Sequence, residues 1–363
     1  MRSNKNASSG RRSPSAERRV RVLIIGGTSF VGRHIAEAVI AAGHGVTFFN
    51  RGITSGELFR EHGHLRGDRR VDVSALANAR GDVVIDTCGF TPDEVRASAS
   101  AVAPWVKRYV FISSIDALDL SAAAIDESSP MRPFPPGTQT ATDEPELYGV
   151  HKAQCERELV SVLGEARVLI ARPGLVVGPF DATDRFTYWV ARVARGGEIL
   201  APRAPSLPVQ IIDARDLATW LAGAITAERS GTYMLTGDPR TLAIADVLET
   251  ARAAGGGAAR FTYVSDAFLE AHDVGPWVEV PLWLPASPEL RGLLDVSNAK
   301  ARATGLTLRP LAQTIADTLA EFNERPASRT LRAGLTPERE RTLLQAWAER
   351  SPSSLIRERR EPA

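Results

Sequence analysis

VRVLIIGGTSFVGRHIAEAVIAAGHGVTFFNRG, residues 20–52, carries the clearest structural pattern in the chain. It opens with an apolar, mostly β-branched run that is typical of a strand buried on both faces, and Gly26 and Gly27 end that run. Apolar residues then recur at helical spacing, and Thr28 or Ser29 is available as the N-cap. The patterns predict a strand, a glycine-bearing turn, a helix and a second strand.

This order of elements is suited to binding an anion. The N-terminal amides of the helix carry partial positive charge, and glycine lets a diphosphate approach the backbone of the turn. The second strand ends at Asn50 and Arg51, where a dinucleotide fold contacts the adenosine ribose. No acid stands there to accept bonds from a ribose 2′-hydroxyl, whereas Arg51 offers a planar cation to a 2′-phosphate. We therefore expect NADP in preference to NAD, with Arg51 as a solvated turn residue left as the alternative.

Charge and cysteine content narrow the class of protein. The net charge of +1 argues against nucleic-acid binding as the main role. No run approaches the roughly 18–20 apolar residues that span a bilayer, so we expect a cytoplasmic protein that does not bind a membrane. Cys88 and Cys155 are expected as small buried side chains, and their spacing indicates neither a disulfide nor a metal site.

The chain is expected to divide into four parts. Residues 1–19 are rich in Arg, Ser and Asn and lack apolar periodicity, so we expect a disordered basic arm, either a solvated tail or a weak contact for an anionic partner. Alternating strand and helix patterns predict an α/β fold, a doubly wound parallel Rossmann sheet, over 20–180, with 208–240 returning to it. Residues 181–330 should form mainly a smaller substrate-binding lobe, and 331–363 a helix and a tail.

Polar residues follow the third expected strand. Asp68 comes just after it and could meet the adenine amino group. His62 and His64 form an H-x-H pair before it, but without a third ligand we expect solvated loop residues and no metal site.

Three further side chains are predicted at the carboxyl ends of the strands. Ser114 ends the strand RYVFISS, and Tyr148 and Lys152 stand four apart at the start of a predicted helix, on one face of it. A neighbouring ammonium and a cationic nicotinamide would both favour the phenolate form of Tyr148. The phenol could then exchange a proton with a substrate hydroxyl during hydride transfer, while Ser114 holds the same oxygen. A tyrosine at the edge of the core, a solvated lysine and a turn serine are the alternative.

GGTSFVG, the serines at 113–114, YGVHK and ARPGLVVGP at 171–179 resemble the extended short-chain dehydrogenase/reductase family, the NAD-dependent epimerase/dehydratase group, over about residues 20–240. The resemblance implies that Tyr148 is the acid/base, with Lys152 as its partner and Ser114 as the oxygen-binding hydroxyl. It also implies a pyrophosphate turn and a backbone stretch facing the nicotinamide amide. The expected cofactor contacts are Gly26, Gly27, Thr28, Ser29, Phe30, Val31, Gly32, Asn50, Arg51, Asp68, Cys88, Gly89, Tyr148, Lys152, Pro173 and Val176.

The sequence departs from that family in three places. Ser29 replaces the middle glycine of the turn, where its hydroxyl could reach a phosphate. Residues 119–147 are long and proline-rich, which predicts a loop covering the substrate. The Asp-Glu pair of sugar-nucleotide dehydratases corresponds to Ile115 and Asp116, so one acid remains and a dehydratase is less favoured.

The second lobe offers candidate substrate contacts. Arg185, Tyr188 and Trp189 could line the pocket, although Tyr and Trp at helical spacing are more often core residues. A rigid loop around Trp283 could lie over the cleft, with surface packing as the alternative. A phosphate-bearing substrate could pair with Arg172, Arg185, Arg203 or Arg215, for each of which a solvated or salt-bridged role is the default.

Two classes of function remain open. The first is an NAD(P)-dependent oxidoreductase or epimerase acting on a secondary alcohol or ketone, with a sugar or nucleotide-linked substrate as one option. The second is a non-catalytic dinucleotide sensor or RNA-associated protein, since relatives with a comparable turn include chloroplast RNA-binding proteins. The resemblance also implies a homodimer formed through the helix that carries Tyr148.

Overall fold

The structure is a computed structural model, and it describes residues 19–54, 57–134, 147–202, 205–326 and 328–350. The expected basic arm, apart from Arg19, lies outside these ranges. So do the centre of the expected substrate-covering loop, Arg203 and the end of the expected tail. No described helix is long and apolar enough to cross a membrane.

The fold class expected from the sequence is confirmed. Among the described residues a seven-stranded sheet has the order β11-β6-β5-β4-β1-β2-β3, and every neighbouring pair is parallel. The strands are β1 (Arg21–Ile25), β2 (Gly45–Asn50), β3 (Gly63–Arg66), β4 (Val83–Asp86), β5 (Arg108–Ile112), β6 (Val168–Pro173) and β11 (Gly231–Leu235). The chain order reverses between β1 and β4, so a ligand crevice is expected outside their carboxyl ends.

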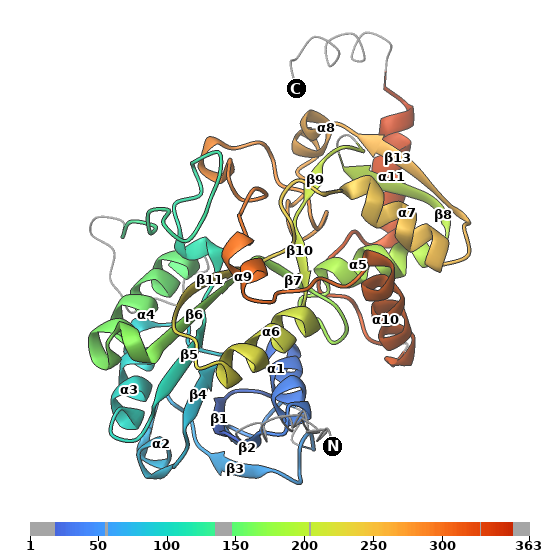
Figure 1. The fold of residues 1–363 in the computed structure, drawn as a ribbon. Coiled ribbons are helices and arrows are strands. Elements are labelled where there is room, and N and C mark those ends of the chain that lie inside the picture. Colours follow the sequence, from blue (N-terminus) through green and yellow to red (C-terminus); the bar gives the residue numbers. More distant parts are fainter. Residues whose placement is uncertain (1–18, 55–56, 135–146, 203–204, 327, 351–363) are drawn as a thin grey trace, which may run out of the picture.

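Helices cover both faces of this sheet (Figure 1). One face carries α1 (Phe30–Ala41) and α6 (Ala214–Thr226), whose apolar residues share one buried cluster with the sheet. The other face carries α2 (Ser74–Asn78), α3 (Pro92–Val102) and α4 (Tyr148–Leu163). The sheet is therefore buried on both sides, as its apolar strands require.

A second apolar core lies beyond the carboxyl edge of the sheet. Its strands pair as β7 (Leu175–Val177) with β10 (Ile211–Asp213), β8 (Gly197–Pro202) with β13 (Ala259–Val264), and β9 (Pro208–Val209) with β12 (Leu242–Ala243). Its helices are α5 (Arg185–Ala194), α7 (Ile244–Ala254), α8 (Asp266–Ala271), α10 (Leu311–Glu324) and α11 (Pro337–Ala348). Short elements elsewhere are α9 (Ala299–Ala303), η1 (Ile115–Ala117), η3 (Glu165–Arg167) and η4 (Pro288–Leu290).

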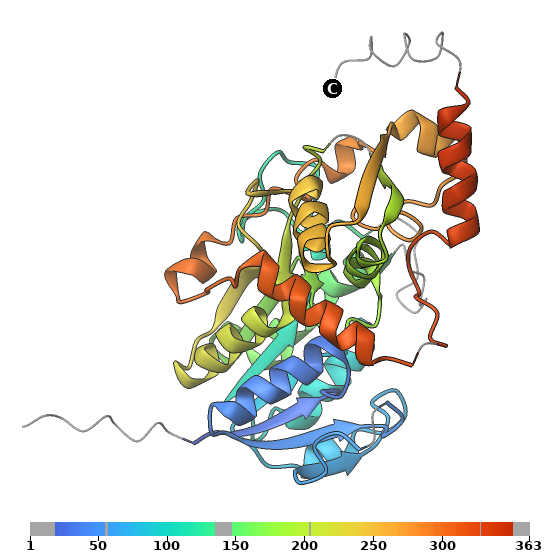
Figure 2. The same cartoon turned by 90° about the vertical axis from the view of Figure 1, so that its right-hand side faces the viewer.

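An ion pair joins the two cores. Figure 2 shows α10 crossing the side of the molecule that faces the viewer, and Arg215 of α6 pairs with Asp317 of α10 at 2.5 Å. Arg215 also pairs with Asp213, so its charge is used within the fold.

Two aromatic residues considered as substrate contacts belong to this second core. Tyr188 and Trp189 are 2% and 0% exposed, which matches the alternative that they are core residues. The Trp283 side chain is also fully buried, and its indole nitrogen donates to Asp266, whereas its neighbour Leu282 lines a cavity. The chain is not helical between α9 and α10, and Gly305 has a φ of +102° there.

Candidate functional site

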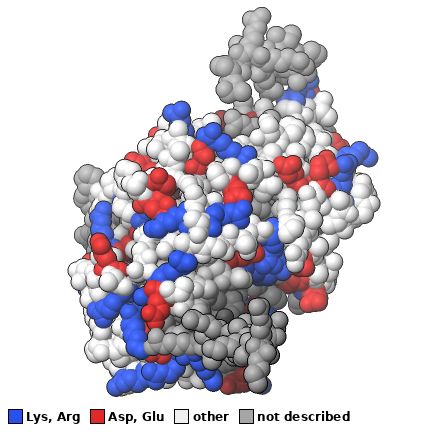
Figure 3. All heavy atoms as spheres, viewed as in Figure 1, with Lys and Arg blue, Asp and Glu red and all other residues white. Residues whose placement is uncertain are grey.

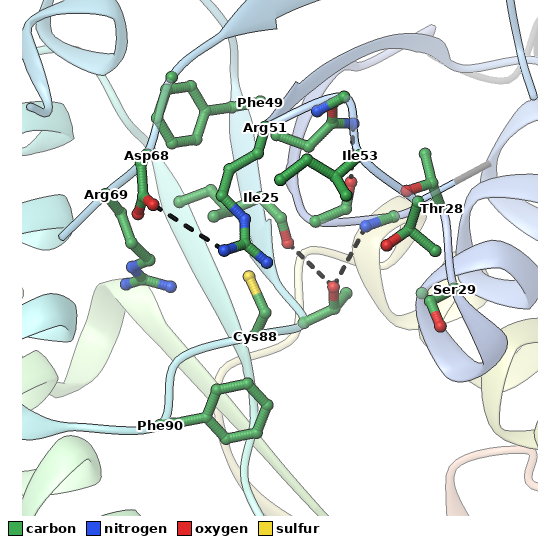
Figure 4. A pocket seen from close by; sticks show the side chains of 18 of the residues that line it. Ile25, Thr28, Ser29, Phe49, Arg51, Ile53, Asp68, Arg69, Cys88 and Phe90 are labelled. Atoms are coloured by element: carbon green, nitrogen blue, oxygen red, sulfur yellow. Dashed lines mark hydrogen bonds and ion pairs between the residues drawn. The ribbon is translucent and has the colours of Figure 1, made fainter. Parts of the chain in front are cut away.

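A pocket of about 420 Å³ lies over the turn between β1 and α1 (Figure 4). The expected contacts that line it are Gly26, Gly27, Thr28, Ser29, Phe30, Val31, Gly32, Asn50, Arg51, Asp68 and Cys88. These residues come from β1, α1 and the segments that follow β2, β3 and β4. The structure therefore brings together at one crevice most of the cofactor contacts expected from the sequence.

Glycine is required in this turn because of backbone shape and close packing. Gly26 and Gly27 have φ values of +92° and +83°, in the left-handed region that L side chains rarely adopt. A Cβ on Gly27 would lie 2.8 Å from the Phe48 ring, and one on Gly32 would lie 3.0 Å from the Gly27 Cα. Thr87 fixes the turn, since its hydroxyl donates to Ile25 and accepts from the Gly27 amide.

Ser29 is the N-cap of α1, but its side chain makes no capping hydrogen bond. Its hydroxyl therefore does not occupy the first-turn amides of the helix, which are the donors an anion would use. The turn fits a diphosphate for three reasons. Gly26 and Gly27 have no side chains that would block the backbone, the helix starts at the turn, and the side chain of the N-cap leaves the first-turn amides available.

Arg51 extends over the pocket at its β2 end, with Cys88 and Phe90 on the wall below it in Figure 4. The Arg51 side chain is 57% exposed, and its Nη1 lies 3.9 Å from the Asp68 carboxylate. Asn50 is held in place, since its amide donates to Gly26 and its oxygen accepts from Arg66 at 2.5 Å. The end of β2 thus presents a loosely paired cation.

A buried ion pair beneath this pocket was not foreseen from the sequence. Arg69 donates to Asp86 at 2.7 Å, and the Tyr109 hydroxyl donates to the same carboxylate at 2.8 Å. Burial alone would raise the pKa of Asp86, but Arg69 and the hydrogen bonds bring it below its ordinary value. A charged residue at the end of the buried strand VVID was the available signal. The pair fixes the segment that carries Cys88, whose amide also donates to Asp86.

A second cavity of about 670 Å³ adjoins the first. Phe30, Val31, Thr87 and Phe90 line both spaces, so they form the boundary between them. The larger cavity is lined on one side by residues 112–116 and the start of α4, and on the other by residues 173–176 and the second core. Pro173 and Val176, expected to face a nicotinamide, are in its wall.

The structure brings Ser114, Tyr148 and Lys152 together in this cavity. Tyr148 is the first residue of α4, and the Ser114 side chain is near enough to its hydroxyl to lower the pKa of the phenol. Helix α4 can approach η1 closely because Gly149 has no side chain: a Cβ there would overlap the carbonyl oxygen of Asp116. Lys152 lies one turn further on and is 2% exposed.

The Lys152 ammonium is held by backbone carbonyls. Its Nζ donates to Gly89 at 2.8 Å and to Ile112 at 2.9 Å, which leaves one of its three N–H donors. Gly89, expected as a cofactor contact, thus serves as an acceptor for Lys152 and does not line either cavity.

Burial and neighbouring groups shift the pKa of Tyr148 in this structure. Burial raises the pKa of Tyr148, the nearby Ser114 hydroxyl opposes this shift, and the nearby Asp116 carboxylate adds to it. The Lys152 ammonium, expected to favour the phenolate, lies 5.7 Å from the ring centroid and is bonded elsewhere. Burial also lowers the pKa of Lys152. In this structure the neutral phenol, a proton donor, is therefore favoured.

Two ion pairs support the serine end of the cavity. Arg132 donates to Asp116 at 2.6 Å, so the single acid left of the dehydratase pair is engaged. Arg172 forms a bidentate pair with Glu156, which also accepts from Ser113 at 2.5 Å. Arg172 is therefore a structural residue and does not face a substrate phosphate.

The expected solvated histidine pair is also corrected. His64 lies in β3 and stacks on Phe48 with ring centroids 5.2 Å apart, and His62 packs edge-on against the same ring. No cluster of three metal-ligating side chains occurs in the part of the chain that the structure describes.

Comparisons with known proteins agree with this fold. The structure resembles UDP-glucose 4-epimerase of Thermus thermophilus in complex with NAD, with a TM-score of 0.61, 20% identity, and coverage of 84% of this chain and 100% of that one. It also resembles UDP-glucuronic acid 4-epimerase of Bacillus cereus in complex with NAD, with a TM-score of 0.63, 14% identity, and coverage of 86% and 99%. At these identities the likeness establishes the fold.

One relative in sequence is named as a stem-loop binding protein and not as an epimerase. Chloroplast stem-loop binding protein of 41 kDa b, from Arabidopsis thaliana, is 26% identical over 232 residues, which is 60% of this chain. The chain covers only 58% of the length of that protein.

The family model for the NAD dependent epimerase/dehydratase family matches residues 22–235, more than half of the chain. That span runs from β1 to the end of β11 and includes the glycine turn, Ser114, Tyr148 and Lys152. The chain belongs to the NAD-dependent epimerase/dehydratase family, the extended short-chain dehydrogenases/reductases.

Proposed function

We propose that the chain is an NADP-preferring oxidoreductase or epimerase that acts by hydride transfer at a secondary alcohol or ketone. One observation carries this proposal: Tyr148, which lies near Ser114 and one turn from Lys152, lines a cavity that adjoins the pocket over the glycine turn. A proton donor and a dinucleotide site are thus next to each other.

Different residues would bind the cofactor and transfer the proton. Gly26, Gly27 and the first turn of α1 would hold the diphosphate, and Lys152 has one N–H donor left for a ribose hydroxyl. A bound nicotinamide dinucleotide would supply or accept the hydride. Tyr148 then gives a proton to the substrate oxygen, or takes one from it, while Ser114 donates a hydrogen bond that orients this oxygen.

The preference for NADP rests on Arg51. Arg51 is the exposed cation at the end of β2, and its guanidinium lies 3.9 Å from the Asp68 carboxylate, which is too far for a hydrogen bond. A 2′-phosphate could therefore replace Asp68 as the partner of Arg51. Arg51→Ser should weaken NADPH binding by about tenfold or more and leave NADH binding within about twofold. Fluorescence titration of both nucleotides tests this, and NADH binding at least about tenfold tighter than NADPH in the wild type would refute the preference.

The same residues serve reduction and epimerisation, which share their first hydride transfer. Dehydration is less favoured because Arg132 engages the Asp116 carboxylate. Relatives whose names specify UDP-sugar epimerases make a nucleotide-linked sugar one candidate substrate. Stoichiometric loss of NADPH absorbance with a substrate identifies a reductase, whereas turnover without net loss identifies an epimerase.

A dinucleotide-binding RNA protein is the second candidate, and the name of the Arabidopsis relative favours it. On the face shown in Figure 3, Lys and Arg side chains are interspersed with Asp and Glu, which is unlike a continuous basic stripe. Tight binding of an RNA stem-loop at about 150 mM salt, together with no hydride transfer to any carbonyl compound, would favour this candidate.

We also propose a homodimer through α4 and its neighbour α3. Arg96 of α3 pairs with Glu158 of α4 at 2.7 Å, which fixes the two helices side by side as one surface. Light scattering after size exclusion measures the mass, and a monomer at assay concentration would refute the dimer.

A further inference from the structure

The larger cavity offers a substrate few free polar side chains. At one place Ser114 and Tyr148 form the oxygen-binding end described above. Most of the other polar side chains in its wall already have partners within the protein. Ser113 donates to Glu156, and Thr183 donates to Asp181.

Gln210 is a clear example of a polar side chain in this wall whose hydrogen bonds are made within the protein. Its amide nitrogen donates to the carbonyls of Gly237 and Val296, and its oxygen accepts from the Val296 amide. Gln210 lines the cavity but has little hydrogen-bonding capacity left for a ligand.

Arg185 is the exception. It is the first residue of α5, it lines the cavity, and its guanidinium carbon lies 5.2 Å from the centroid of the Trp277 ring. Among the described residues no carboxylate forms an ion pair with it. The adjacent Asp184 is fully buried and paired with Arg325 at 2.7 Å, and Asp181 accepts from Thr183.

The charges around Arg185 favour an anionic ligand. Burial lowers the pKa of Arg185, and Asp181 is the acid whose charge opposes that shift. Burial also raises the pKa of Asp181, which weakens it as a counter-ion. A cation that is partly desolvated, stacked on an aromatic ring and without a close acid gains most from an oxyanion.

The wall of the cavity around Trp277 and Arg185 is largely apolar. Leu175, Val209, Leu282, Leu293 and Leu294 contribute aliphatic surface. A hydroxyl buried against such a wall loses its hydrogen bonds to water without replacement, at about 1–3 kcal/mol each. A ligand with many hydroxyls is therefore disfavoured, whereas an apolar carbon frame gains from burial.

We propose that this site takes a keto or hydroxy compound with an apolar body and a single carboxylate, which Arg185 binds. One cation suits one monoanionic group, and a planar guanidinium matches a planar carboxylate. The orientation of the reacting oxygen toward Tyr148 rests on the proposed function, but the binding of the carboxylate does not.

The test uses 4-oxocyclohexanecarboxylate and 4-acetylbenzoate, each compared with its neutral methyl ester, and UDP-glucose as the polyhydroxylated comparison. Calorimetry measures binding to the full chain loaded with NADP⁺, with which a ketone does not react. Reduction is then followed with NADPH. The variants are Arg185→Gln, Arg185→Lys and, as a matched control, Arg195→Gln, which removes an exposed cation at the other end of α5.

At least one acid should bind about 10- to 100-fold tighter than its ester, the range of a charge-assisted hydrogen-bonded pair. Arg185→Gln should abolish that difference, Arg185→Lys should keep part of it, and Arg195→Gln should keep all of it. The proposal is overturned if neither acid binds, if acid and ester bind equally, if the difference survives in Arg185→Gln, or if UDP-glucose binds tighter than the acids.

The two proposals fail separately. If an acid binds in an Arg185-dependent manner but no hydride is transferred, the carboxylate site stands and the proposed reductase activity fails. If the ketones are reduced with no dependence on Arg185 or on the carboxylate, the reductase stands and the carboxylate site fails.

Discussion

Replacing Gly149 with alanine should separate the two elements that carry Ser114 and Tyr148. Gly149 is the second residue of α4, and a Cβ there would overlap the carbonyl oxygen of Asp116 and lie 3.0 Å from its Cγ. Because the nearest atom is backbone, η1 has to move as a unit. Overpacking of this kind costs about 1–3 kcal/mol, whereas alanine in a helix normally gains about 0.5–1 kcal/mol over glycine. We expect a net loss of about 1–2 kcal/mol.

Gly223 provides the matched control. It lies in α6, is exposed, and has no atom within 4 Å of a built Cβ, so Gly223→Ala should stabilise the protein by about 0.5–1 kcal/mol. Urea unfolding followed by circular dichroism measures both variants. Equal stability of the Gly149 and Gly223 variants would refute the close contact between α4 and η1.

The movement of η1 should also be visible at Tyr148. The nearby Ser114 hydroxyl opposes the rise in the Tyr148 pKa, so moving it away in Gly149→Ala should raise that pKa further. NMR titration of ¹³Cζ-labelled tyrosine measures it, with the signal assigned by Tyr148→Phe. A destabilised Gly149 variant with an unchanged Tyr148 pKa would support the close contact between α4 and η1, but it would refute the effect of that contact on Tyr148.

Arg132→Gln leaves the Asp116 carboxylate unpaired, so the Tyr148 pKa should rise in the same titration, and a fall would contradict the assigned ion pair. Asp86→Asn strands the buried Arg69 and should cost about 3–5 kcal/mol in urea unfolding. Folding lowers the pKa of Asp86, so the stability that this carboxylate contributes is complete above its unfolded pKa of about 3.9 and is lost as the pH falls through the lower folded value. If Asp86→Asn lost as much stability in acid as the wild type does, the assigned ion pair would be contradicted. Burial raises the pKa of Cys88 to about 11, so alkylation by iodoacetamide should be slow near about pH 8 and slower still with NADP⁺ bound, and fast alkylation, or no protection by the nucleotide, would place the thiol elsewhere.

The dinucleotide fold and the family could be predicted because their signals are local in the sequence. The strand, the glycine turn and the helix follow one another within residues 20–52, and each element has its own periodicity. Ser114, Tyr148 and Lys152 could be placed together because parallel strands end at one edge and a helix brings residues four apart onto one face. Their roles as catalytic residues stay predictions.

Contacts between distant residues account for what the sequence did not reveal. Nothing local indicates that Arg69 pairs with Asp86 or that Arg132 pairs with Asp116, since each pair joins different segments. Trp283 looked like a loop residue between prolines, but its ring is buried in the second core. The hydrogen bonds of Lys152 to the carbonyls of Gly89 and Ile112 also join distant segments, so the sequence does not indicate them.

The central claim is that Tyr148 supplies the proton for hydride transfer at a nicotinamide dinucleotide bound over the glycine turn. The direct measurement follows deuterium from [4,4-²H₂]NADPH into the alcohol product of a ketone, by mass spectrometry, for the wild type and Tyr148→Phe. The wild type should transfer the label, and Tyr148→Phe should lower the rate by about 10²–10⁴-fold while binding NADPH within about twofold of the wild type. Label transfer at the wild-type rate in Tyr148→Phe would contradict the account.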